Sequence, residues 1–172
     1  MNINQDTFII GSTGRINIAK QDHYTNLLRQ TTQCMSAVLG GANAVTVEPY
    51  DFMANESNER IARMAKNIPL ILKEESYLDK IIDPSNGSYY LEWLTNEWLN
   101  KSSEILKQIE GLGGYSIAQD FVNTEVEKVK AIRKELFANN EIELIGVNLY
   151  PNENLEPLES NQDYYSYENT LK

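Results

Sequence analysis

The sequence has few of the side chains on which most catalytic sites depend. It contains one cysteine, Cys34, and one histidine, His23, among 172 residues. A lone cysteine excludes an internal disulfide and is typical of a reducing compartment, and its place on an apolar helical stripe predicts a buried side chain rather than a nucleophile. A lone histidine excludes the clustered imidazoles of a usual catalytic zinc site and leaves one candidate general base. Because His23 lies at a predicted helix start, we expect it to be a partly exposed first-turn residue.

Long apolar runs and positive charge are scarce as well. No run approaches the roughly 18 apolar residues of a membrane span, and nothing at the start of the chain is typical of a signal peptide. The formal charge of −10 and the isoelectric point near 4.6 disfavour binding to nucleic acid or to an anionic membrane. Four basic residues do cluster, and we interpret them as the solvated face of a helix: Lys128, Lys130, Arg133 and Lys134. We therefore expect a soluble, cytoplasmic protein that binds neither nucleic acid nor membrane.

Short apolar runs alternate with segments of helical periodicity along most of the chain. We expect short strands at Thr7–Ile10, Ala44–Val47 and Lys80–Ile82, the first buried and the second buried on both faces. Helices are expected from Asp22 to Leu39, Ile61 to Leu72, Leu91 to Ile109 and about Asn123 to Ala138. Pro69 should kink or divide the second of these helices because it removes a backbone donor.

A strand followed by a helix, repeated three times, is the pattern of parallel βα units, since two parallel strands need a crossover connection. The length is sufficient for one domain with a sizeable core, but it is well short of the roughly 250 residues of a complete eight-stranded barrel. From Ser160 on, the chain is polar and has no apolar period, which predicts a disordered or loosely docked tail.

Few residues suggest chemistry of their own. Gly11-Ser12-Thr13-Gly14 lies between a predicted strand and a helix, where small residues let backbone amides approach an anion, but it matches neither the P-loop nor the dinucleotide pattern. Glu74, Glu75 and Asp79 lack the spacing of metal ligands. No Gly-x-Ser-x-Gly elbow is present. Taken alone, these residues indicate an α/β domain without a visible active site.

Several motifs in a fixed order do resemble a known family. The first lies within Tyr24–Val47 and reads Tyr-Thr-Asn-Leu-Leu-Arg-Gln-Thr-Thr, followed by Ala-Val-Leu-Gly-Gly-Ala. The second, within Asp83–Leu94, reads Asp-Pro-Ser-Asn-Gly-Ser-Tyr-Tyr-Leu-Glu, and Ile-Gly-Val-Asn follows at 145–148. Over residues 8 to 150 their order and spacing are similar to the second half of the barrel of the methylmalonyl-CoA mutase family, from about its sixth strand to its end.

The resemblance implies a fold and a division of the chain. We expect an α/β fold that is a partial TIM (β/α)8 barrel, with roughly the last three βα units and the C-terminal helices. Residues 1–158 would form this C-terminal half of the barrel domain and residues 159–172 a polar tail, so that the chain stops before the linker to a cobalamin-binding domain. The family isomerises acyl-CoA thioesters with adenosylcobalamin, which a separate domain with an Asp-x-His-x-x-Gly loop holds. That loop is absent from this sequence.

The positions that match the family's catalytic motif carry other residues. Active members read Arg-Thr-His-x-Gln-Thr-Ser-Gly-Trp at the sixth strand, where this chain has residues 8–16 and keeps only Thr13. Phe8 and Ile10 stand at the arginine and histidine positions, and Arg15 stands where a glycine lets the corrin ring approach. After the seventh strand, the family's Asp-Glu-Ala-x-Ala-Leu-Pro corresponds to residues 51–57, and only Asp51 is kept.

Because packing motifs persist while ligand-facing positions do not, the resemblance is closest to the noncatalytic small subunit of a two-subunit mutase. It implies a heterodimer with a mutase large subunit, no catalytic, cofactor or metal residue in this chain, and no adenosylcobalamin bound by the chain alone. One alternative is the catalytic barrel fragment of a split acyl-CoA mutase, joined to its missing barrel half, with Ser12 and Thr13 lining the substrate pocket. Another is a stand-alone binding module that reuses a half-barrel. Whether the chain is part of an active enzyme stays open at this point.

Overall fold

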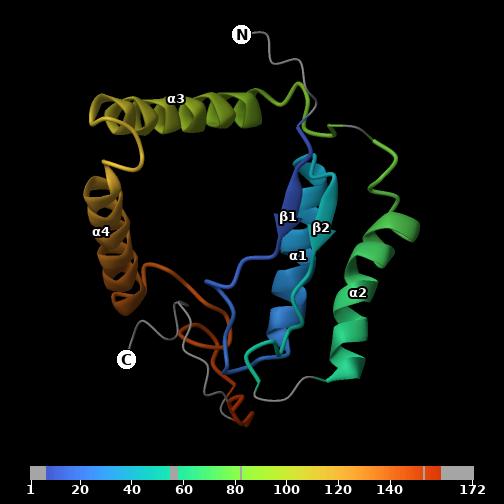
Figure 1. The fold of residues 1–172 in the computed structure, drawn as a ribbon. Helices are drawn as coiled ribbons and strands as arrows, with labels where there is room; N and C mark the ends of the chain where they lie inside the picture. The colour runs from blue at the N-terminus through green and yellow to red at the C-terminus, as the bar shows by residue number, and fades with distance from the viewer. Residues whose placement is uncertain (1–6, 55–57, 82, 153, 160–172) are drawn as a thin grey trace. The chain divides into compact units, whose positions relative to one another are not determined.

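The computed structural model describes residues 7–54, 58–81, 83–152 and 154–159. These residues form two compact units (Figure 1). The first unit combines the chain up to Pro84 with the segment that begins at Asn140, and the second unit comprises Ser85–Asn139. Each unit is described by itself.

The first unit contains a parallel βαβ arrangement followed by a second helix. Strand β1 (Ile10–Ser12) is joined by helix α1 (Thr25–Leu39) to strand β2 (Ala44–Thr46), and helix α2 (Glu59–Glu74) follows. The two strands pair in parallel with Gly11 opposite Val45. Figure 1 shows α1 against the strands and α2 beside α1. The predicted parallel βα pattern is therefore confirmed for these two strands.

The core of this unit lies between α1, α2 and one face of the sheet. Cys34, Ile68 and Leu72 are buried together, and partly buried apolar side chains pack against them: Leu27, Val45, Val47 and Leu78. The prediction that Cys34 is a buried side chain is confirmed, since it is fully inaccessible to solvent. Pro69 lies inside α2, which nevertheless runs unbroken, so the expected division of this helix does not occur.

The predicted first strand is displaced along the sequence. Pairing with β2 begins at Ile10, whereas Phe8 and Ile9 lie outside the strand and are exposed. Asn43 explains the limit: its Oδ1 accepts a hydrogen bond from the Ile9 amide at 2.7 Å, and its own backbone amide donates to the Ile9 carbonyl at 2.8 Å. The prediction of a buried strand at Thr7–Ile10 is wrong, because these two hydrogen bonds between Asn43 and Ile9 mark the end of the pairing with β2.

Only one face of the two-stranded sheet is covered. Gly11 approaches α1 so closely that a Cβ there would lie 3.2 Å from the Cβ of Ala37. Side chains alternate between the faces of a strand, and the opposite face is exposed at four positions. We call these residues the open face: Ile10, Ser12, Ala44 and Thr46. The expectation that the second strand is buried on both faces is therefore wrong.

The third predicted strand does not form in the described part of the chain. Lys80 and Ile81 lie in a bend, and Ile81 is 65% exposed; Ile82, the remaining residue of the predicted strand, lies outside the described residues. A strand exists only where a neighbour completes its hydrogen bonds, and Lys80 and Ile81 have no paired strand among the described residues. The described fold is thus a mixed α/β arrangement with two parallel strands and four helices.

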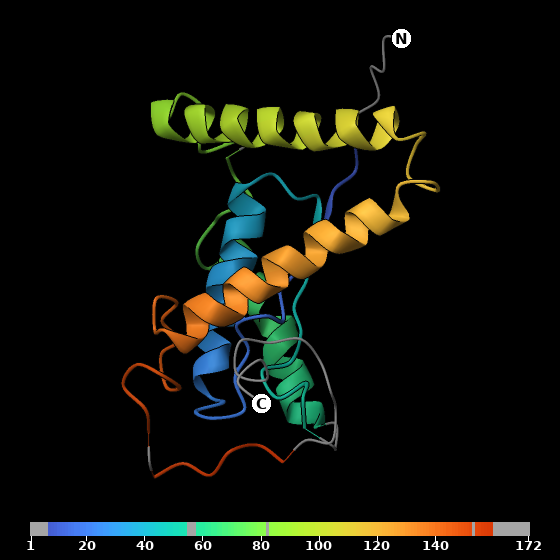
Figure 2. The same cartoon turned by 90° about the vertical axis from the view of Figure 1, so that its left-hand side faces the viewer.

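The second unit consists of two helices. Helix α3 (Tyr89–Gly111) and helix α4 (Gln119–Ala138) are joined by residues 112–118 (Figure 2). Helix α3 ends at Gly111, close to its predicted end at Ile109 and at the first residue of the glycine cluster Gly111-Leu112-Gly113-Gly114, and α4 begins earlier than its apolar period indicated. The basic cluster on α4 is exposed, with Lys128 and Lys130 bonded to Glu125 and Glu127, which confirms the prediction of a solvated face.

In the described ranges, no helix has both the length and the apolar character needed to cross a membrane. The predicted polar tail, residues 159–172, lies outside the described residues except for Glu159.

Candidate functional site

The carboxyl ends of parallel strands are the usual place for a site in α/β proteins, because the loops that follow the strands meet there. Thr13 follows β1 directly and is buried. Its backbone amide donates to the Thr46 carbonyl at 3.1 Å, and its Oγ1 accepts from the Glu48 amide at 3.0 Å. Thr13 therefore fastens the two strand ends together, whereas Ser12 is exposed on the open face.

The glycine-containing loop after β1 is held by side chains. The Gly14 amide donates to Oε1 of Gln33 at 2.6 Å, and Nε2 of Gln33 donates to Oδ1 of Asn17 at 2.8 Å. A backbone amide that already has a strong acceptor is not free to bind an anion. Of the backbone amides at residues 11–14 that could have approached an anion, that of Gly14 is thus already engaged within the protein.

Arg15 lies at the same edge and is anchored by two groups. Its guanidinium forms an ion pair with Glu48 and lies over the ring of Phe52, with 4.9 Å between Cζ and the ring centre. Both contacts favour a fixed orientation for a side chain that is about half exposed. The loops after β1 and β2 are therefore bridged by a cation, a carboxylate and an aromatic ring.

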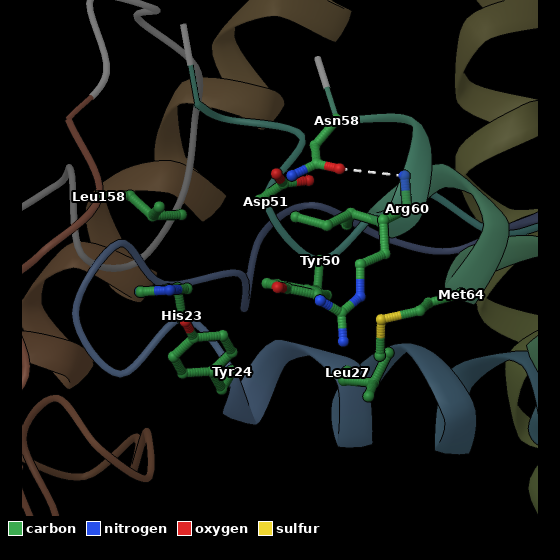
Figure 3. A pocket seen from close by; sticks show the side chains of 10 residues that line it. His23, Tyr24, Leu27, Tyr50, Asp51, Asn58, Arg60, Met64 and Leu158 are labelled. Atoms are coloured by element: carbon green, nitrogen blue, oxygen red, sulfur yellow. Dashed lines mark hydrogen bonds between the residues drawn. The ribbon is translucent and has the colours of Figure 1, made fainter. Parts of the chain in front are cut away.

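A cavity of about 460 Å³ opens beside these loops (Figure 3). Its walls come from the turn before α1, the loop after β2, the first turns of α2 and one residue of the C-terminal segment, whose amide donates to the Lys20 carbonyl at 3.0 Å. The lining residues are His23, Tyr24, Leu27, Tyr50, Asp51, Asn58, Arg60, Ile61, Met64 and Leu158.

His23 is the most unusual residue of this cavity. Only 9% of it is exposed, its ring centre lies 4.2 Å from that of Tyr24, and it stacks on Tyr50 at 6.2 Å. Its Nδ1 is buried without a hydrogen-bond partner in the described part of the chain. The expectation of a partly exposed first-turn residue is wrong, because the ring of Tyr50, distant in sequence, covers the imidazole.

Burial changes the acid–base properties of the cavity. Desolvation lowers the pKa of His23 below its ordinary 6.5, although the nearby carboxylates of Asp22 and Asp51 act in the opposite direction. Desolvation raises the pKa of Asp51, opposed by its own backbone hydrogen bond and by His23. Desolvation also raises the pKa of Tyr50, with Tyr24 and Asp51 adding to the effect and Arg60 opposing it.

These pKa shifts predict how folding stability depends on pH. Because the pKa of His23 is lower in the folded chain, the unfolded chain binds the extra proton first, so stability should fall as the pH drops through 6.5. We expect His23→Phe to lose less stability than the wild-type chain between about pH 7.5 and 5. Asp51 is present in both proteins, so its opposite contribution cancels to first order. Urea unfolding at several pH values checks this, and parallel stability curves for the two proteins would contradict it.

This cavity was not predicted from the sequence, although a signal for it was present. His23 and Tyr24 lie at the start of a predicted helix, and Tyr50 and Asp51 lie just after a predicted strand. In a βαβ unit, the loop before the helix and the loop after the second strand meet at the same edge. These four residues could therefore have been placed together from the sequence.

Comparison with known proteins adds to this geometry. The family model "Methylmalonyl-CoA mutase" matches residues 4–170, almost the whole chain. The chain belongs to the methylmalonyl-CoA mutase family. Relatives include the methylmalonyl-CoA mutase small subunit of Porphyromonas gingivalis, 36% identical over 76% of this chain and 22% of that protein. The small subunit of Streptomyces virginiae is 33% identical over 81% of this chain and 23% of its own length. The methylmalonyl-CoA mutase of Rhizobium meliloti is 34% identical over 86% of this chain and 21% of its own length.

This member of the mutase family spans about a fifth of the length of the relatives that it matches. Proteins named as small subunits and proteins named simply as mutases match it at similar identity. The family uses adenosylcobalamin. At Arg15, where the resemblance places the approach of the corrin ring, the described residues do not offer the open surface of a glycine, because the guanidinium is paired with Glu48 and lies over the ring of Phe52. The lone imidazole is also buried among tyrosines.

Proposed function

We propose that this chain is a structural, noncatalytic portion of a methylmalonyl-CoA mutase small subunit, and that it supports a catalytic large subunit. The open face of the two-stranded sheet carries this proposal. Sheets of two strands are marginal on their own, and an edge strand exposes unpaired N–H and C=O groups. In a completed barrel, strands from the rest of the barrel would pair with these strand edges and cover the open face.

The residues at the positions of the family's catalytic motif support a role without chemistry. Phe8 and Ile10 are apolar and exposed, Thr13 is engaged in fastening the strands, and Arg15 is fixed by Glu48. None of these side chains is placed to move a proton or to bind a thioester. The names of the small subunits of Porphyromonas gingivalis and Streptomyces virginiae are consistent with this assignment.

One observation favours a second candidate, the catalytic fragment of a split acyl-CoA mutase. Ser12 is exposed on the open face, which would point toward the interior of a completed barrel, where a substrate would lie. In that case Ser12 and Thr13 would line the substrate pocket, and the chain would need a missing barrel half. A stand-alone binding module, in contrast, would remain a stable monomer.

Co-expression with a mutase large subunit separates these roles through three variants. Ile10→Asp places a charge on the open face, where Ile10 is 68% exposed, so we expect at least about a tenfold loss of complex on size-exclusion chromatography. Leu28→Asp is the matched control, because Leu28 is 66% exposed on α1 and lies outside the open face. Ser12→Ala should leave both assembly and turnover unchanged.

Each outcome decides between the candidates. If the wild-type chain forms no complex, or if Leu28→Asp weakens the complex as much as Ile10→Asp, the proposed supporting role is wrong. If Ser12→Ala lowers turnover of an assembled complex while leaving its amount unchanged, the catalytic fragment is favoured instead. If the chain is a monodisperse monomer that forms no complex with any large subunit or barrel half tested, the stand-alone module is favoured.

A further inference from the structure

The cavity around His23 holds two opposite charges that do not neutralise each other. Arg60 and Asp51 both line it, yet no ion pair joins them, and within the described ranges the Arg60 guanidinium has no carboxylate within 4.0 Å. Figure 3 shows the guanidinium extending toward Tyr50 and Leu27, away from Asp51. The two charges therefore face the same space from different sides.

The walls between these charges are aromatic and apolar. The rings of Tyr24 and Tyr50 lie 5.6 Å apart at 50°, and Leu27, Met64 and Leu158 complete the lining. Such a surface suits an apolar side chain, and the faces of tyrosine rings also attract a cation. A volume of about 460 Å³ is in the usual range for a site that binds a small molecule.

His23 gives an independent indication of a ligand. More than nine-tenths of the residue is buried, and its Nδ1 has no hydrogen-bond partner among the described residues. Leaving a buried polar atom unpaired is costly, so such atoms are rare unless something else can bind them. His23 lines the cavity, and a polar group placed there can supply the missing hydrogen bond.

The start of helix α2 favours a carboxylate near Arg60. The helix is 16 residues long and begins at Glu59, and the side chain of Asn58 accepts a hydrogen bond from the Arg60 amide at 3.0 Å. The N-terminus of a helix carries partial positive charge, which adds to the attraction of the guanidinium for an anion.

We propose that this cavity binds a small zwitterion of the amino-acid class, with its carboxylate on Arg60 and its ammonium group at Asp51. A lone anion would be attracted by Arg60 but repelled by Asp51, and a lone cation would meet the reverse. A ligand with both charges satisfies both groups, and its apolar side chain lies against the tyrosines and Met64. This site is independent of the proposed supporting role and is not needed for it.

Three compounds test the charge requirement on the full chain. L-Phenylalanine carries both charges, 3-phenylpropanoate lacks the ammonium group, and 2-phenylethylamine lacks the carboxylate, while all three share the same ring. We expect isothermal titration calorimetry at neutral pH to show that phenylalanine binds at least about tenfold more tightly than either analogue.

Variants then assign each charge to its residue. Arg60→Gln should weaken phenylalanine at least about tenfold and remove its advantage over 2-phenylethylamine, because both then lack the same contact. Arg63→Gln is the matched control: Arg63 is exposed one turn further along α2 and does not line the cavity. His23→Phe keeps a ring but removes Nδ1, and it should weaken phenylalanine several-fold. Asp51→Asn should remove the advantage over 3-phenylpropanoate.

The proposal does not depend on the one variant that carries a risk to folding. Asp51 is buried, so the affinity of Asp51→Asn is interpreted only if its circular dichroism spectrum matches that of the wild-type chain. Arg60 is exposed, and its substitution leaves the core intact. Equal affinity for the three compounds, no heat of binding up to about 10 mM, or an equal loss in Arg63→Gln and Arg60→Gln would each overturn the proposal. None of these results bears on assembly with a large subunit.

Discussion

Replacing Asn26 by alanine is expected to destabilise the first unit by about 3–5 kcal/mol. Asn26 is fully buried and joins separate segments of the chain. Its Oδ1 accepts from the Ala19 amide at 3.1 Å, and its Nδ2 donates to the carbonyls of Ala19 at 2.8 Å and Tyr50 at 3.1 Å. Alanine would leave these backbone groups buried without partners, which is the costly way to lose hydrogen bonds.

The effect should extend to the C-terminal segment. Arg29 donates to Oδ1 of Asn26 at 2.7 Å and also to the carbonyl of Ile145, so the loss of Asn26 removes one of the hydrogen bonds that orient the guanidinium toward this segment. Asn26→Asp keeps the acceptor but loses both donations, and its loss should be intermediate. Urea unfolding measures both changes, with Asn96→Ala on the exposed surface of α3 as control, expected within about 0.5 kcal/mol of wild type. A loss in Asn26→Ala no larger than in this control would refute the role assigned to Asn26.

Gly146→Ala is the second substitution with a large expected effect, about 2–5 kcal/mol of destabilisation. Gly146 has φ of +81°, a conformation that costs an L residue about 1–2 kcal/mol. A Cβ there would also lie 2.6 Å from Cβ of Asp22, an atom close to the backbone that cannot swing aside. Steric overlap is thus added to the backbone strain.

Gly41→Ala separates these two contributions. Gly41 has φ of +83°, but a Cβ at this position would meet nothing within 4 Å. Thermal unfolding of both variants should therefore show a small loss for Gly41→Ala and a larger one for Gly146→Ala. Equal losses would mean that the chain around Asp22 relaxes freely and that the close approach carries no cost.

The helices of this chain could be predicted from the sequence with good accuracy, because their signals are local. Leu27, Cys34 and Val38 recur with helical spacing, and Gly40 and Gly41 end the pattern where α1 ends. The periodicity of α3 and its glycine cluster acted in the same way. Such patterns can be recognised from the local sequence alone, since each turn of a helix forms its hydrogen bonds with the turn before it.

The strands were harder because their limits are set by residues elsewhere. The apolar run that ends at Ile10 predicted a strand, but Asn43 holds Ile9 outside the ladder. Lys80 and Ile81 have no neighbouring strand in the described part of the chain, so the short run that predicted a strand did not make one. Pairing partners distant in sequence decide such cases, and a single sequence does not name them.

The candidate site shows the same division. The departures at Phe8, Ile10 and Arg15 were visible from the family resemblance, but the bridge from Arg15 to Glu48 and Phe52 was not. The burial of His23 depends on Tyr50, which reaches it only after the chain has folded back through α1 and β2. Ser12 and Thr13 remain predicted substrate contacts that only the assembly experiments test.

The open face also sets a risk for the newly made chain. While Ile10 and the strand edges beside it stay uncovered, a second copy of the same polypeptide can pair along those edges. Synthesis without a companion would then favour aggregates or removal by cellular proteases. The yield of this protein in a cell should accordingly rise with the supply of whatever chain completes its sheet.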